Sequence, residues 1–107
     1  MALFALTDRQ RDDLTAIARR WGVETFELFG SALGDGFGPE SDVDLLVTFQ
    51  PGVRRSLFDL VAMEYELEDA LRRPVDLVTR RGIERSANPI RRSSILSSAR
   101  PIYEAAP

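Results

Sequence analysis

The chain has 107 residues, 44% of them hydrophobic and 29% charged, and a formal net charge of −3. These values suit one globular domain, residues 1–107, with a single core. It contains no histidine, cysteine or lysine, and all 14 basic residues are arginine. This composition excludes Ser-His-Asp triads, thiol catalysis, Cys- or His-ligated metals, Walker A loops and Schiff-base chemistry. Without a membrane-length apolar run, a signal peptide or cysteines, a cytoplasmic location is expected.

The first half of the chain predicts a helix followed by two strands. Thr7 and Gln10 form a capping-box pattern, and apolar residues then recur at helical spacing, which indicates a helix over about 8–21 that ends at Gly22. Residues 24–29 and 42–49 are predicted strands, and the second is apolar on both faces after Asp44. The glycine-rich residues between them are predicted to form a loop or a short helical turn.

The second half predicts two helices, each followed by a short strand. Ser56 and Asp59 form a second cap, which indicates a helix over about 57–72 that is stopped by Pro74. A strand is predicted over 75–78 and a helix from Asn88-Pro89 to about 98, and residues 101–104 suit a small edge strand. The order predicts an α/β (α+β) fold, a small mixed sheet with helices mainly on one face.

Charge is distributed unevenly along the chain. Residues 21–49 contain six acidic side chains and no basic one, whereas residues 80–100 contain six arginines and one glutamate. The acidic half suits cations, and the basic end suits phosphate or an acidic partner, although solvated helix faces also explain these arginines. The net charge argues against direct nucleic-acid binding.

Three aspartates are the candidate catalytic and metal-binding residues. Asp42 and Asp44 point to the same face of one strand, with Cα atoms roughly 6.5–7 Å apart, and Asp76 interrupts the apolar strand 75–78. If those strands are neighbours, the three carboxylates converge, as they do in two-metal sites for nucleotidyl transfer with Mg²⁺ or Mn²⁺. The alternatives are a strand-entry role for Asp42 and a solvent-facing edge position for Asp76.

Gly30 and Ser31 are the candidate phosphate-binding residues. They follow the first predicted strand, where a glycine lets the backbone approach a phosphate closely and the serine offers a hydroxyl and an N–H. An ordinary strand-to-loop turn is the alternative, since Gly-Ser is a common turn dipeptide.

This combination resembles a known family. Gly30-Ser31, ten residues and then Asp42-Val43-Asp44-Leu45-Leu46-Val47 is similar to the signature of minimal nucleotidyltransferases (MNT) in the DNA polymerase β-like superfamily. The segments Leu57–Leu60 and Pro74–Thr79 also fit, so the resemblance covers nearly the whole chain. It implies the polymerase β-like fold and, in particular, an MntA-like antitoxin of a HEPN/MNT toxin–antitoxin pair.

The resemblance implies roles for the matching residues. Asp42, Asp44 and Asp76 would bind the metals, with Asp76 near the acceptor hydroxyl, and Gly30 and Ser31 would hold the ATP phosphates. The implied activity is transfer of AMP from ATP to a hydroxyl of a HEPN-domain toxin ribonuclease. Relatives commonly carry an arginine at the position of Gly34, so Arg54, Arg55 or a partner would have to replace it. The alternatives are a weak or inactive antitoxin that acts by binding, and a transferase for small molecules such as aminoglycosides.

Overall fold

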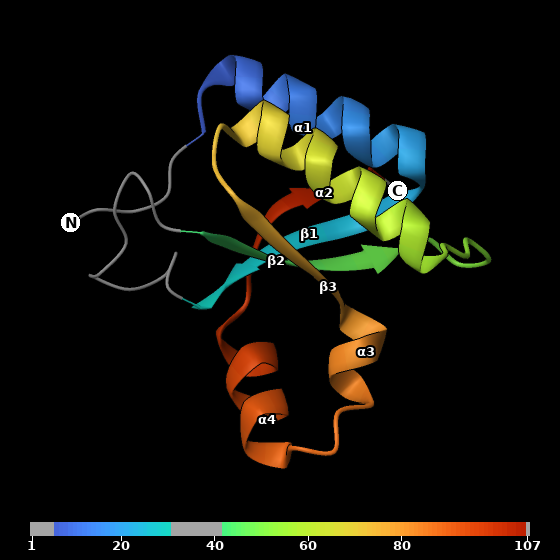
Figure 1. Ribbon diagram of the computed structural model, residues 1–107, viewed down its shortest axis with the longest axis vertical. Coiled ribbons are helices and arrows are strands. Elements are labelled where there is room, and N and C mark those ends of the chain that lie inside the picture. The colour runs from blue at the N-terminus through green and yellow to red at the C-terminus, as the bar shows by residue number, and fades with distance from the viewer. Residues whose placement is uncertain (1–5, 31–41, 107) are drawn as a thin grey trace.

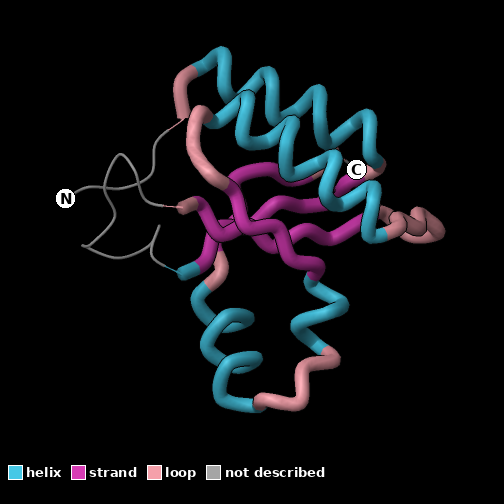
Figure 2. Tube along the Cα trace, viewed as in Figure 1, coloured by secondary structure: helices cyan, strands magenta, loops and turns pink. Residues whose placement is uncertain are grey.

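In the computed structural model, which describes residues 6–30 and 42–106, two long capped helices lie on one side of a sheet (Figures 1 and 2). Helix α1 (Asp8–Trp21) begins at Thr7 with the predicted capping box and ends at Gly22, whose φ of 72° is left-handed. Helix α2 (Leu57–Leu71) begins at Ser56 with a second capping box. It ends within one residue of the prediction, where Arg72 adopts the left-handed conformation two residues before Pro74.

The sheet has four strands in the order β3-β2-β1-β4. Strand β1 (Val23–Phe29) pairs antiparallel with β2 (Val43–Phe49), and the neighbours β2 and β3 (Val75–Thr79) are parallel. Strand β4 (Arg100–Glu104) pairs antiparallel with β1 and forms the far edge, as the sequence predicts. The parallel pair requires a crossover between β2 and β3, and α2 supplies it.

Two short helices cover the opposite face of the sheet. Helix α4 (Pro89–Ser98) begins at Asn88, whose side chain accepts hydrogen bonds from the Ile90 and Arg91 amides. The sequence does not predict helix α3 (Arg80–Glu84), because Gly82 in its middle is a poor helix former. Thr79 caps α3 by accepting a hydrogen bond from the Gly82 N–H, so the glycine is contained within the helix.

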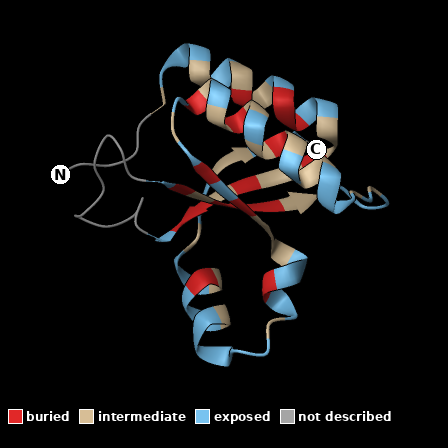
Figure 3. Cartoon of the chain, in the orientation of Figure 1, coloured by how far each residue is buried: buried red, intermediate tan, exposed pale blue. Residues whose placement is uncertain are grey.

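Apolar residues form a separate core on each face (Figure 3). The alternation of side chains along β2 divides them, because Val43, Leu45 and Val47 point toward α1 and α2. Leu46 points the other way, into a smaller core that also contains Phe29, Ile83 and Ile95. Polar side chains at alternate strand positions therefore lie on the same face as this smaller core.

The two sheet edges differ in their covering. On β3, the backbone N–H groups of Val75 and Leu77 donate to the carboxylates of Glu68 and Glu64, at 2.9 and 2.8 Å. On β4, Pro101 has no N–H to offer. Within the described residues, no helix is both long and apolar enough to cross a bilayer.

Candidate nucleotide site

Asp44 and Asp76 are register partners on the parallel strands β2 and β3. Neighbouring strands lie about 4.7–4.9 Å apart, so the two side chains leave the sheet next to each other. Asp44 is half-buried and Asp76 is exposed, and both lie on the face of the smaller core. Asp42 is exposed and directly precedes β2. The fold thus brings two of the three predicted carboxylates together and leaves the third at the strand entry.

Gly30 lies against Asp44 at the same edge of the sheet. It directly follows β1, whose last residue, Phe29, pairs with Asp44. Its φ of 72° is left-handed, and a Cβ built on it would collide with Oδ2 of Asp44. A glycine is therefore required here both by the backbone and by the carboxylate. Ser31, the other predicted phosphate-binding residue, lies outside the described residues, as does Gly34.

The donor set fits a hard divalent cation in part. Asp44 and Asp76 offer oxygen ligands from adjacent strands, and Gly30 leaves room beside one of them. Among the residues that the structure describes, however, no three acidic side chains gather closely enough to hold an ion by themselves. Mg²⁺ commonly binds through one or two carboxylates and completes its shell with water and substrate phosphates. The arrangement suits such an ion when it arrives with a nucleotide.

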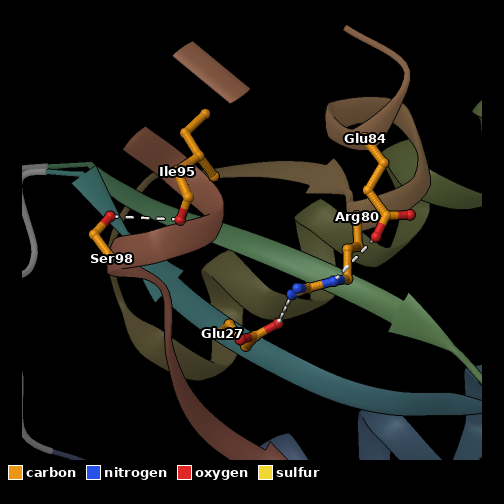
Figure 4. Close-up of polar contacts among 5 residues, drawn as sticks. All are labelled: Glu27, Arg80, Glu84, Ile95 and Ser98. Atoms are coloured by element: carbon orange, nitrogen blue, oxygen red, sulfur yellow. Dashed lines mark hydrogen bonds and ion pairs between the residues drawn. The ribbon is translucent and has the colours of Figure 1, made fainter. Parts of the chain in front are cut away.

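An ion pair fixes the next part of this face (Figure 4). Glu27, on β1, accepts a hydrogen bond of 2.8 Å from Arg80, and its side chain is only 16% exposed. Arg80 also lies 3.5 Å from Glu84, one turn further along α3. Because Arg80 is the first residue of α3, the pair links α3 to β1, on the face of the sheet that carries the carboxylates. No pattern in the sequence predicts this pair, since residues 27 and 80 are brought together only by the fold.

A pocket of about 600 Å³ adjoins Gly30. Phe29 and Gly30 form one wall, and α4 forms the other from Asn88 to Ser98. The volume lies within the usual range for small-molecule sites, about 300–1,000 Å³. Arg91 is one of the six arginines of residues 80–100, and nothing in the sequence predicts that it lies near Gly30. A pocket of about 690 Å³ between α1 and α2 contains none of the predicted site residues.

The loop after β2 lies too far from the carboxylates to supply an arginine in place of the one that Gly34 replaces. Arg54 and Arg55 follow the C-terminal end of β2, whereas Asp42 and Asp44 lie at its N-terminal end. Seven residues of strand separate the two ends by about 20 Å. Arg55 is also engaged elsewhere: its Nε donates to the Trp21 carbonyl at 3.0 Å, and its guanidinium stacks on the Trp21 ring. The predicted substitution by these arginines is therefore wrong on geometric grounds.

The sequence profile of the nucleotidyltransferase domain matches residues 14–102. The chain belongs to this family. A Methanocaldococcus jannaschii protein with the provisional name of protein adenylyltransferase is 37% identical over 83 residues, which are 78% of this chain and 83% of that protein. A solved structure with the provisional name of minimal nucleotidyltransferase is 32% identical, with a TM-score of 0.65, over 87% of this chain and 89% of its own.

Two further solved structures share the fold of the present chain at lower sequence identity. One is a toxin–antitoxin with AMP-PNP, with a TM-score of 0.67 and 20% identity over 89% of this chain and 73% of its own. The other is a tri-AMPylated Shewanella oneidensis HEPN toxin in complex with an MNT antitoxin, with a TM-score of 0.60 and 18% identity over 90% and 71%. The predicted family and the polymerase β-like fold are thereby confirmed.

Proposed function

We propose that this minimal nucleotidyltransferase transfers AMP from ATP to a protein hydroxyl, with Mg²⁺ or Mn²⁺, and acts as the antitoxin of a HEPN-type toxin. The observation that carries the proposal is the register pairing of Asp44 with Asp76 beside Gly30. The family supports nucleotidyl transfer, and the relative named for protein adenylylation supports a protein acceptor. The tri-AMPylated HEPN toxin bound to an MNT antitoxin supports this class of partner.

The described site residues would have separate roles in holding the metal ions and the triphosphate. Asp44 and Asp76, with Asp42 at the strand entry, would hold the divalent ions. Those ions, when bound, neutralise phosphate charge and lower the pKa of an acceptor hydroxyl. Gly30, which carries no side chain, lets the triphosphate approach the backbone next to Asp44.

The chemical step is a substitution at the α-phosphorus of ATP. The acceptor oxygen forms a bond to that phosphorus, and the bond to the β-phosphate oxygen breaks, which releases pyrophosphate. The proton of the acceptor hydroxyl passes to a nearby base. Asp76 is the candidate, because it is the exposed member of the pair and can face an incoming protein.

The test is transfer of label from α-labelled ATP to a co-expressed HEPN-type partner, with Mg²⁺ or Mn²⁺. We expect labelling by the wild type and its loss in Asp44→Asn and Asp76→Asn, each of which removes a charge but keeps the shape of the side chain. Asp69→Asn is the matched control, because Asp69 is exposed on α2, outside the site face. No labelling by the wild type, or equal labelling by Asp44→Asn, would contradict the proposal.

Neutralisation by binding alone is the second candidate function, and Gly34 favours it. The family resemblance implies an arginine at that position, and the glycine present there supplies no positive charge to a triphosphate. In that case Asp44→Asn would still protect cells from the toxin. Loss of protection by Asp44→Asn, with complex formation intact, would reject this second function.

A further inference from the structure

The pocket beside Gly30 runs away from the sheet along α4. Ile95 belongs to the smaller core with Phe29, so the C-terminal half of α4 lies nearest the end of β1. Asn88 and Arg91 line the pocket from the first turn of the helix. Arg91 and Ser98 are seven residues apart, which is about 10 Å along a helix. The pocket is therefore elongated, with Gly30 and the carboxylate edge at one end.

Two polar side chains of this pocket wall have no partner elsewhere in the described part of the protein. Arg91 and Ser94 are exposed, three residues apart on one face of α4, and engage no other described side chain or backbone group. Their neighbours are engaged: Arg92 donates to the Ser86 carbonyl at 2.7 Å, and Ser98 donates to the Ser94 carbonyl at 2.7 Å. Ser98 also lies 3.4 Å from the Ile95 carbonyl (Figure 4).

Arg91 is also the sole charged residue among the described residues that line the pocket. It stands beside Ile90, which is 81% exposed despite its apolar side chain. A planar guanidinium next to an exposed aliphatic side chain offers a surface for a flat aromatic ligand, because arginine stacks on aromatic rings and nucleobases. Ser94, between Arg91 and the Gly30 end, adds a hydroxyl at the height where a sugar would lie.

We propose that this pocket holds the nucleoside half of the nucleotide, with the base against Arg91 and Ile90 and the ribose near Ser94. The inference rests on the proposed function, which places the phosphates at Gly30. With the triphosphate beside Asp44 and Asp76, the nucleoside must extend away from these carboxylates. The α4 pocket starts at Gly30 and offers space in that direction. The first turn of α4 then determines nucleotide affinity through the base.

The experiment is titration calorimetry of the full chain with Mg²⁺ and either ATP or inorganic tripolyphosphate. We expect Arg91→Gln to weaken ATP binding roughly 2- to 30-fold, which is the usual range for a guanidinium stacked on an aromatic ring. Binding of tripolyphosphate, which has no base, should stay unchanged. Arg85→Gln is the matched control, because it removes the same charge from an exposed position in the α3–α4 connection.

Three results would overturn the inference. Equal ATP affinity of Arg91→Gln and the wild type would show that the pocket does not hold the base. Equal weakening of ATP binding and tripolyphosphate binding would show that Arg91 contacts the phosphates rather than the base. An equal loss of ATP affinity in Arg85→Gln would show that removal of any nearby positive charge, and not of Arg91 in particular, weakens binding. These outcomes differ from failure of the proposed function, in which the wild type would neither bind ATP nor transfer label.

Discussion

The backbone N–H of Leu77 donates a hydrogen bond of 2.8 Å to Oε2 of Glu64. The N–H of Val75 donates in the same way to Glu68, one helical turn further along α2. These two residues flank Asp76, whose side chain points to the opposite face of the sheet. Helix α2 thus fixes the outer edge of β3 at the position of one candidate catalytic carboxylate, from the side where no catalysis is proposed.

Glu64→Ala is expected to lower the free energy of unfolding by about 1–3 kcal/mol, because it leaves the Leu77 N–H without its charged acceptor. Glu64→Gln, which keeps an acceptor oxygen, should lose less. Urea denaturation measures both, and Asp69→Ala, at an exposed position of the same helix, should stay within about 0.5 kcal/mol of the wild type. An equal loss in Glu64→Ala and Asp69→Ala would contradict the role of this bond.

Gly30→Ala and Gly52→Ala form a matched pair that separates backbone strain from damage to the site. Both glycines are left-handed, with φ of 72° and 84°, so each alanine should destabilise the fold by about 1–2 kcal/mol. Nothing lies within 4 Å of a Cβ at Gly52, whereas a Cβ at Gly30 meets the Asp44 carboxylate. Gly30→Ala alone should reduce AMP transfer, on the order of 100-fold, because Asp44 is displaced.

The measurements are thermal unfolding and label transfer on the same preparations. Similar melting temperatures with unequal transfer are the expected result. If Gly52→Ala lost transfer to the same extent, the effect would come from strain rather than from contact with Asp44.

The ion pair between Glu27 and Arg80 should show a coupling energy of about 1–2 kcal/mol in a double-mutant cycle, because Glu27 is 16% exposed. The comparison pair is Arg20 and Glu66, whose side chains are 58% and 30% exposed and whose coupling should stay below about 1 kcal/mol. Chemical denaturation of the single and double alanine variants gives both values. Equal coupling in the two cycles would contradict a special role for the pair on the site face.

Truncation of two apolar residues of α2 should change the stability of the protein by very different amounts. Met63 is fully buried, so Met63→Ala should destabilise the protein by about 2–5 kcal/mol. Phe58 is 86% exposed, so Phe58→Ala should change stability by less than about 0.5 kcal/mol. Denaturation midpoints test this difference, and a large loss in Phe58→Ala would show that its ring is covered in solution.

Local signals in the sequence were sufficient for most elements of the fold. The caps at Thr7, Ser56 and Asn88 mark three helix starts correctly, because a cap is a hydrogen bond within four residues of chain. Helix α3 was not predicted, although Thr79 caps it by an equally local hydrogen bond, because Thr79 directly follows the predicted strand 75–78 and Gly82 is a poor helix former. The cost of Gly82 is outweighed by burial of Ile83 in the smaller core.

The candidate site could be predicted only where residues lie close together in the sequence or match a family motif. The Asp44–Asp76 juxtaposition followed from a parallel crossover that the element order suggested. The Glu27–Arg80 pair and the position of Arg91 beside Gly30 depend on how α3 and α4 fold back under the sheet. No periodicity in the sequence predicts this arrangement of α3 and α4, so the sequence suggested only that these arginines lie on exposed helix faces.

The division of the apolar residues into two cores affects the dynamics of the protein. Among the described residues, the smaller core contains four buried side chains, and its helices are short. Segments with few buried contacts open with less free energy than the rest of a domain. Amide hydrogens of α3 and α4 should therefore exchange faster than those of β2, and a bound nucleotide would slow them. Among the described helices and strands, those that form the wall of the proposed base pocket would then unfold first and gain the most protection from the ligand.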